Sequence, residues 1–286
     1  MEQQVRPDDV PEVPGLDAER RRRYMAGPAA LLGGPANVIM QLGLPPVGRG
    51  VVESTVESGQ YVLRPRKRGR TTLTYLAVAM LGTDEDRVAY REAVDTSHRH
   101  VRSGPGSPVR YNAFDPALQL WVAACIYRGV ADSMALFYGR IEDNLLDGFY
   151  RESARFGTTL QVPERLWPDD RAGFARYWDS MLERVSYDDE VRRYLLEQVV
   201  GLGPYGVVER VLFGRVNRFF TIGFLPQRFR DELGLSWSPA RQRVFEAVMR
   251  GIGGLLRLLP QRWRAYPFDR YLVDMRRRQA AGEPLV

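Results

Sequence analysis

Residues 115–139 read DPALQLWVAACIYRGVADSMALFYG, and this stretch decides the fold class. Asp115 suits a helix N-cap, and Pro116 suits the first helical position, where a missing backbone N–H costs nothing. The apolar run that follows has the length of a helix. We therefore expect one long core helix here.

The flanking sequence repeats this pattern of a capping residue followed by apolar residues three and four positions apart. Thr83 opens such a stretch with Asp86 three residues later, as in a capping box. Similar stretches cover residues 168–185, 189–200 and 238–259, whereas no long segment alternates as a strand does. The sequence predicts an all-α fold with one helical domain over residues 18–276, between tails at 1–17 and 277–286.

The composition limits the class of protein further. The chain has 286 residues, 44% of them apolar, a net charge of +6 and a single cysteine, Cys125, in an apolar run. An internal disulfide is excluded, and Cys125 is expected to be a small buried residue. The N-terminus does not resemble a secretory signal, and no apolar run reaches the ~18 residues of a spanning helix. We expect a cytoplasmic protein, with peripheral membrane contact left open.

Common catalytic motifs are absent. The chain contains no H-E-x-x-H zinc motif and no G-x-S-x-G elbow. The stretch GLGPYG at 201–206 matches G-x-G-x-x-G, but it follows a helical pattern rather than a strand, so we interpret it as a turn.

The two histidines, His98 and His100, lie in the stretch DTSHRHVRSG at 95–104. On one helix they point about 160° apart, so they cannot bind one metal together. His98 lies nearer the apolar side formed by Tyr90, Val94 and Val101, which favours it for an interior site. A core histidine bonded to a carbonyl is the alternative reading of His98, and His100 is expected at the surface.

Five basic residues occur in RPRKRGR at 64–70, directly before a helix that we expect to be capped by Thr71 or Thr72. A helix N-terminus with arginines nearby can bind a carboxylate or a phosphate. A solvated basic loop explains the same pattern. Two further features stay open in the same way: Arg128 and Asp132 form either a buried pair at a site or an exposed edge, and the aromatic residues of 174–178 line either core or pocket.

Several segments together resemble a known family. They are GPANVIMQLGLPPVGRGVVES at 34–54, RGRTTLTYLAVAMLGTDED at 68–86, SHRHVRSG at 97–104, YNAFDPALQLWVAA at 111–124, and the long segment 224–267. Their order and spacing are similar to those of the MpaB and latex-clearing-protein (rubber oxygenase) catalytic domains. The resemblance covers about residues 25–275.

The resemblance implies a globin-like helical core that holds haem b, and an oxygenase that uses dioxygen on isoprenoid-like substrates. It implies that His98, in the family's H-x-x-V element, is the proximal iron ligand. The family's R-x-x-K/R-T element falls on Lys67, Arg70 and Thr71, which the resemblance places near the haem edge.

The chain also departs from the family pattern. Arg70 stands where rubber oxygenases have a lysine, and an arginine stays protonated and cannot ligate iron. Leu44 and Ala123 stand where many members have auxiliary histidines, so any catalysis that depends on those histidines is in doubt.

Three functions follow from the sequence. The first is a haem-dependent oxygenase for an apolar, isoprenoid- or lipid-like substrate, and the second is a non-catalytic carrier of haem or an apolar ligand. The third is a basic helical protein that binds a membrane surface or nucleic acid through RPRKRGR at 64–70 and ERRRRY at 19–24. Nucleic acid ranks last among these partners, and the sequence leaves the oligomeric state open.

Overall fold

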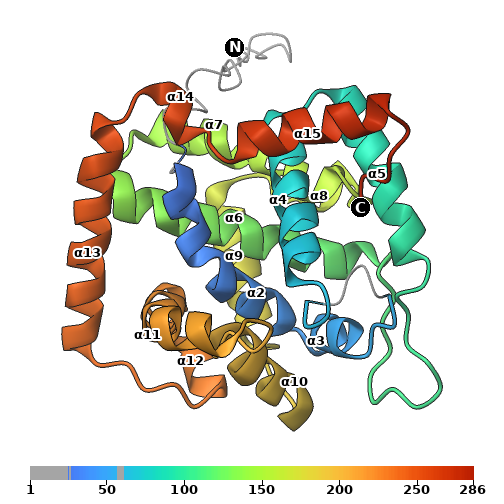
Figure 1. Cartoon of the computed structure of the whole chain (residues 1–286), viewed down its shortest axis with the longest axis horizontal. Coiled ribbons are helices and arrows are strands. Elements are labelled where there is room, and N and C mark those ends of the chain that lie inside the picture. The colour runs from blue at the N-terminus through green and yellow to red at the C-terminus, as the bar shows by residue number, and fades with distance from the viewer. Residues whose placement is uncertain (1–24, 26, 57–60) are drawn as a thin grey trace, which may run out of the picture.

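Helix α6 (Pro116–Tyr138), the long helix predicted from the sequence, lies in the middle of the molecule (Figure 1). The computed structural model describes residues 25, 27–56 and 61–286. Pro116 begins α6, and the Asp115 carboxylate accepts a hydrogen bond from the N–H of Ala117 at 2.8 Å. Trp121 and Cys125 of α6 have no exposed surface, because the helix is covered on several sides.

The other helices surround α6, and within the described ranges no strand forms apart from an isolated antiparallel bridge between Arg102 and Asn112. The all-α prediction is therefore confirmed. The helices are η2 (Gly27–Gly33), α2 (Gly34–Leu42), α3 (Pro45–Val52), α4 (Pro65–Leu81), α5 (Asp84–His98), α7 (Asp143–Ser153), α8 (Arg155–Thr158), η4 (Glu164–Leu166), α9 (Arg171–Leu182), α10 (Asp189–Tyr194), a π-helical turn η5 (Leu195–Val200), α11 (Val207–Phe224), α12 (Gln227–Glu232), α13 (Pro239–Leu258), α14 (Gln261–Arg264) and α15 (Phe268–Ala280).

Two side chains fasten α2 to α6. The Asn37 amide donates to the Cys125 carbonyl at 2.7 Å, and the Trp121 indole N–H donates to the Gln41 carbonyl at 3.0 Å. Trp121 also stacks on Trp178 of α9 with ring centroids 5.3 Å apart. Phe174, Trp178 and Met181 are buried, so the aromatic residues of α9 belong to the core.

The structure moves the start of α4 to Pro65, six residues before the expected cap at Thr71. Proline fits the first helical position because its ring fixes φ and its missing N–H has no helical partner there. The basic run at 64–70 is therefore wrongly assigned to a loop, because most of it forms the first turns of α4. As a result, Arg66 and Arg70 lie one turn apart on the same face of α4, whereas Lys67 and Arg68 point in other directions.

The two ends of the expected domain differ in what the structure shows. The predicted tail at 1–17 lies outside the described residues. At the other end, α15 continues to Ala280, four residues into the segment that we expected as a tail at 277–286. Leu285 and Val286 then pack against the apolar cluster that α4, α5 and α15 share.

Helix α6 is long and apolar enough to cross a membrane by length and composition, so the expectation that no segment has this length is wrong. Only Arg128 and Asp132 are charged along it. Of its most apolar 18-residue window, 56% is buried inside the protein, as in a core helix.

Candidate functional site

A cavity of about 750 Å³ lies beside α6, between α2, α3, α4, α5 and α8. Its volume falls in the ~300–1,000 Å³ range of cofactor and small-molecule sites. Most of the wall is apolar, and its members include Val51, Leu76, Val94, Val122, Ile126 and Phe156. A site of this kind favours a large apolar ligand and excludes water.

His98 is the last residue of α5 and lines this cavity, as do Tyr90, Val94 and Val101. The apolar side predicted for this segment is confirmed. Burial, and then the positive charge of Arg68, lower the pKa of His98 to about 4. The imidazole is therefore neutral at physiological pH, the form that can ligate a metal.

The Nδ1 atom of His98 is buried and has no hydrogen-bond partner among the described residues. A core histidine bonded to a carbonyl, the alternative reading of this residue, does not match that environment. Asp95, one helical turn earlier, accepts a hydrogen bond from the Gln161 amide instead, while the His98 ring meets the edge of Phe114. His100 lies beyond the end of α5 and is exposed.

Arg68 is the basic residue of α4 that lines the cavity. Its side chain is exposed overall, and desolvation lowers the pKa of its guanidinium group. Tyr194 and Tyr90 are its nearest titratable neighbours, and within the described part of the chain no carboxylate pairs with it. A cavity-lining cation that pairs with no described carboxylate marks a place where an anionic group of a ligand could bind.

The three residues of the R-x-x-K/R-T element have separate surroundings. Thr71 is buried and lines the cavity, and its hydroxyl donates to the carbonyls of Lys67 and Arg68 within α4. The carbonyl of Thr71 accepts a hydrogen bond from the Tyr90 hydroxyl at 2.7 Å, which joins α4 to α5. Lys67 and Arg70 are absent from the cavity wall, so their cofactor role stays a prediction.

Arg68 was not among the predicted site residues, although helical spacing indicates that it lies on the cavity face of α4. Once α4 starts at Pro65, Arg68 lies seven and eleven residues before Tyr75 and Ala79, which places all three on one face. Tyr75 and Ala79 line the cavity as well. The spacing of Arg68 relative to Tyr75 and Ala79 was visible in the sequence. It was not used, because residues 65–70 were placed before the helix instead of inside it.

The positions of the missing auxiliary histidines do not reach the cavity wall. Leu44 and Ala123 are both buried in the main hydrophobic core, with 2% and 0% of their surface exposed. In this chain those two positions contribute to packing.

Arg128 and Asp132 were expected to form either a buried pair at a site or an exposed edge, and the structure shows part of each. Their side chains form an ion pair at 2.9 Å, and Arg128 also lies 5.8 Å from the Trp178 ring centre. Asp132 lines the cavity, and burial raises its pKa, whereas Arg128 is partly exposed. The pair therefore bridges the cavity wall and the surface.

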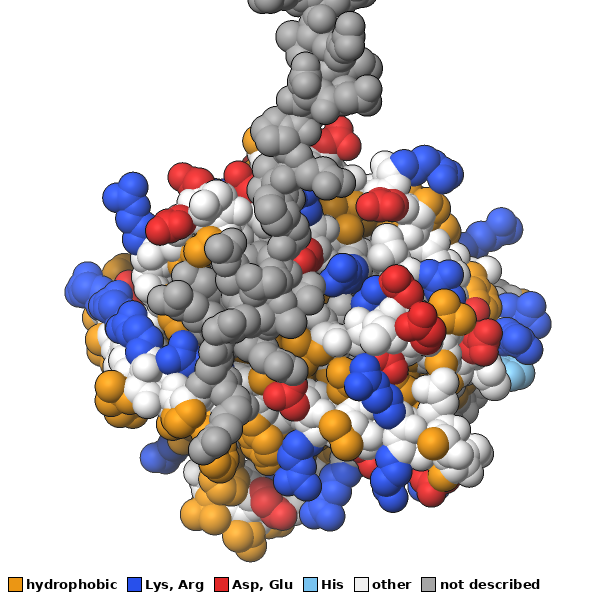
Figure 2. Space-filling model, turned by 90° about the horizontal axis from the view of Figure 1, so that it is seen from above, with side chains coloured by type: hydrophobic (Ala, Val, Ile, Leu, Met, Phe, Trp, Pro, Cys, Tyr) orange, Lys and Arg blue, Asp and Glu red, His pale blue; other side chains and the backbone are white. Residues whose placement is uncertain are grey.

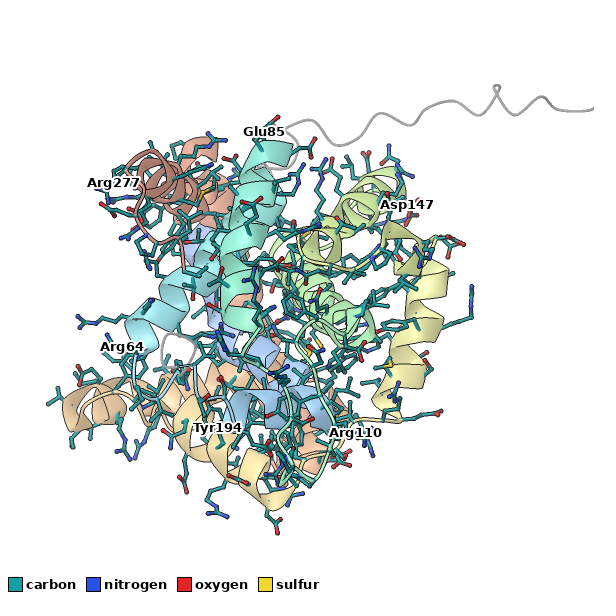
Figure 3. The ribbon with its side chains drawn as sticks, turned by 90° about the vertical axis from the view of Figure 1, so that its right-hand side faces the viewer. Arg64, Glu85, Arg110, Asp147, Tyr194 and Arg277 are labelled. Atoms are coloured by element: carbon teal, nitrogen blue, oxygen red, sulfur yellow. The ribbon has the colours of Figure 1, made fainter. Side chains whose placement is uncertain are left out.

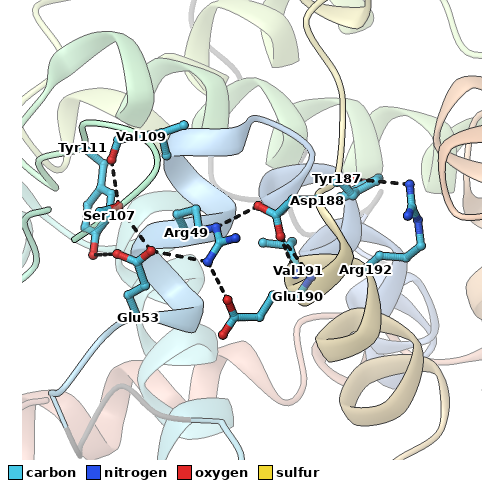
Figure 4. Close-up of polar contacts among 10 residues, drawn as sticks. All are labelled: Arg49, Glu53, Ser107, Val109, Tyr111, Tyr187, Asp188, Glu190, Val191 and Arg192. Carbon is cyan, nitrogen blue, oxygen red and sulfur yellow. Dashed lines mark hydrogen bonds and ion pairs between the residues drawn. The ribbon is translucent and has the colours of Figure 1, made fainter.

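A polar network includes Tyr111, which lines the cavity (Figure 4). The Tyr111 hydroxyl donates to Glu53 at 2.9 Å, and Glu53 pairs with Arg49 at 3.5 Å. Arg49 then reaches Asp188 at 2.7 Å and Glu190 at 2.5 Å, so the network joins α3 to the start of α10. These contacts hold the loop that follows His98 against the body of the protein.

The described residues provide no cluster of three or more His, Cys, Asp or Glu side chains that could hold a metal ion. His98 therefore offers one protein ligand, and a metal held there needs its remaining ligands from a bound molecule. Neutral imidazole, an unpaired cation and apolar walls together suit a mostly apolar metal-containing cofactor with an anionic edge.

Comparison with known proteins agrees with the resemblance seen in the sequence. Residues 21–254 match the family described as ER-bound oxygenase mpaB/B'/Rubber oxygenase, catalytic domain. The chain is 48% identical over 252 residues to the uncharacterized protein Mb2261 of Mycobacterium bovis and, equally, to the uncharacterized protein Rv2237 of Mycobacterium tuberculosis. Each match covers 88% of this chain and 98% of the relative.

No solved structure matches this chain, so the globin-like description of its core stays a prediction. The matched family spans α2 to α13 almost completely and therefore includes the cavity, His98 and Arg68. The chain belongs to the family of the ER-bound oxygenase mpaB/B' and rubber oxygenase catalytic domains.

Proposed function

We propose that this protein is a haem b-dependent oxygenase that acts with dioxygen on an apolar, isoprenoid- or lipid-like substrate in the cavity. His98 is the protein ligand to the iron, and Arg68 pairs with a haem propionate. Thr71 lies on the same stretch of wall as Arg68, and Lys67 and Arg70 remain predicted contacts at the haem edge.

The observation that carries this proposal is a neutral His98 imidazole that lines the same cavity as Arg68. Within the described part of the chain, His98 Nδ1 is buried without a partner and Arg68 pairs with no carboxylate. Burial of His98 Nδ1 and desolvation of the Arg68 charge both cost free energy unless a partner compensates for them. A ligand with a metal and a carboxylate would bind the cavity-lining His98 imidazole and pair with Arg68. The size and apolar wall of the cavity fit such a group.

Bound haem supplies the iron that reacts with dioxygen, and the protein supplies orientation and a dry environment. The residues of this chain have three tasks. His98 holds the iron, Arg68 fixes the anionic edge, and the apolar wall residues exclude water and accept the substrate. None of the three tasks needs a protein general base.

Hemin titration of the purified protein tests the haem site. We expect wild type to develop the Soret band of ligated haem, His98→Ala to lose it, and His100→Ala to keep it, because His100 is exposed beyond the helix end. Loss of the band in both variants, or in neither, contradicts the role of His98.

A second experiment separates an oxygenase from a carrier. The haem-loaded protein is reduced under air with polyisoprene, farnesyl and fatty-acyl compounds, and products are analysed for new aldehyde or ketone groups. Cleavage or oxidation products that disappear in His98→Ala support the oxygenase. A haem-bound protein that forms no product across this panel is a carrier, the alternative left open by the missing auxiliary histidines.

A further inference from the structure

The first half of α11 is a helix whose large apolar side chains face solvent instead of the core. The six apolar residues among the first ten of α11 are all between 50% and 74% exposed: Val207, Val208, Val211, Leu212, Phe213 and Val216. In Figure 3 this half of α11 extends away from the body as the tan helix at the left. Soluble monomers rarely expose so many neighbouring apolar side chains without a binding role.

Helix α13 carries a second exposed apolar stripe. Val244, Val248, Leu255 and Leu258 recur at spacings of four, seven and three residues, so they lie on one face of the helix. They are 37–81% exposed. Phe245, Met249 and Leu256 form a separate, buried face of the same helix, so the exposed stripe is not needed for packing inside the protein.

The two helices belong to one side of the molecule. They contact each other, and Figure 2 shows hydrophobic side chains gathered along its lower-left side, where α11 and α13 lie. Trp263, which follows α13, is 55% exposed and adds an aromatic side chain of the kind enriched at membrane–water interfaces. We call the outward faces of α11 and α13 the apolar face.

Arginines surround the apolar face. Arg243, Arg250 and Arg257 recur every seven residues along α13 and form a row beside the apolar stripe. Arg241 on α13 and the arginines at 210, 215 and 218 on α11 bring the total to seven. Glu209 and Glu246 are the acidic residues of these two helices, so seven positive and two negative charges give a net +5.

We propose that the apolar face docks on the surface of an anionic phospholipid bilayer. Apolar side chains flanked by arginines are the pattern of interfacial helices, in which the apolar side enters the headgroup boundary and arginines pair with lipid phosphates. A second copy of this chain is a poorer partner, because two copies of a face with net charge +5 repel each other.

Docking also has a consequence for the cavity. Tyr205 lies two residues before α11, lines the cavity and is 39% exposed. A bilayer on the apolar face therefore lies next to this part of the cavity wall. Entry of an apolar substrate past Tyr205 rests on the proposed function, whereas docking itself does not depend on haem or catalysis.

Vesicle flotation of the purified full chain tests the proposal. We compare vesicles of pure phosphatidylcholine with vesicles that also contain anionic phosphatidylglycerol. Wild type is expected to float with the anionic vesicles and to dissociate as salt rises, because screening weakens the arginine contacts. Absence of binding to anionic vesicles overturns the proposal.

Two sets of variants locate the contact. Arg243→Gln/Arg250→Gln/Arg257→Gln should weaken partitioning by more than tenfold, since each arginine near an anionic surface contributes roughly fivefold. The control Arg99→Gln/Arg110→Gln/Arg176→Gln removes the same charge from exposed sites elsewhere and should retain most binding. Equal losses in both sets contradict a defined docking face.

Leu212→Gln/Phe213→Gln tests the apolar contribution, with Val88→Gln/Val273→Gln as its exposed control on α5 and α15. The first pair should lose vesicle binding and the second should keep it. Light scattering without vesicles then distinguishes a protein partner. If Leu212→Gln/Phe213→Gln converts a dimer to a monomer and leaves vesicle binding intact, the face is a self-association surface and the proposal is wrong.

Discussion

Arg68 and His98 show how the surroundings of a single side chain can indicate a ligand. Arg68 has no carboxylate partner in the described structure, and its charge contributes to the low pKa of His98. The free protein gains nothing from placing these groups together. A ligand that binds in the cavity therefore explains why Arg68 and His98 lie together.

Replacing Arg68 should affect stability and ligand binding in opposite directions. Arg68→Met removes an unpaired charge from the cavity wall, so the melting temperature of the haem-free protein is expected to rise. Hemin affinity is expected to fall about tenfold, because a charged hydrogen bond to a propionate is lost. Thermal unfolding and hemin titration measure the two effects.

Arg70→Met is the matched control for this change. Arg70 belongs to the same turns of α4 but does not line the cavity, so hemin affinity should change little. A fall in melting temperature for Arg68→Met, or an equal loss of affinity in both variants, would show that Arg68 is a structural residue.

At the scale of elements, the crossing of α13 over α6 depends on one glycine. A Cβ atom at Gly253 would lie 2.0 Å from the carbonyl oxygen of Phe137, so any side chain at this position pushes the two helices apart. Phe137 is itself buried in the cluster that joins these helices. Close approach of the backbones explains why a poor helix former occupies the middle of α13.

Gly253→Ala is therefore expected to destabilise the protein by about 2 kcal/mol or more, although alanine favours a helix by about 1 kcal/mol over glycine. Gly251→Ala is the control, because a Cβ atom there meets nothing within 4 Å. Gly251→Ala should be neutral or stabilising. Urea unfolding measures both, and a neutral Gly253→Ala would show that the crossing can relax at little cost.

At the scale of the whole molecule, the C-terminal helix completes the structure around the cavity. Helix α15 crosses the end of α4 at the top of Figure 1 and contacts it, and Phe268 and Val286 line the cavity. Arg276 of α15 pairs with Asp86 at 2.7 Å, and Asp86 also accepts a hydrogen bond from the N–H of Thr83 at 2.8 Å. One carboxylate thus caps α5 and holds the end of the chain.

This contact predicts a pH dependence. The hydrogen bond from Arg276, followed by that from Thr83, holds the pKa of Asp86 below its usual value despite partial burial. Because the folded state binds the proton more weakly than the unfolded state, the contribution is complete above the usual pKa of about 4 and is lost as pH falls below it.

Arg276→Gln should remove this contribution, about 1 kcal/mol at neutral pH because Arg276 is half exposed, and much less at pH 3. Urea unfolding at both values measures the difference. Arg277→Gln is the control, because Arg277 is an exposed neighbour that pairs with Asp274 at the surface. Equal losses for Arg276→Gln at both pH values would contradict the assigned role of Asp86.

The sequence by itself determined the all-α class, the start of α6 at Pro116, the capping box of Thr83 and Asp86, and the inward position of His98. These features depend on local spacing and capping, which a sequence displays directly. It also contained the family signal. The start of α4 was misplaced because Thr71 and Thr72 are preferred capping residues, whereas Arg64 makes no side-chain cap. Pro65 is the local signal for the observed start.

Only the tertiary structure decided which groups meet. Arg68 and His98 come from different helices, Gly253 meets Phe137 across more than one hundred residues, and the C-terminus closes the cavity wall. The exposed apolar face of α11 and α13 was likewise hidden in the sequence, because its residues have the spacing of core residues. Which apolar face is covered depends on the packing of helices distant in the chain, and that packing has no local signature.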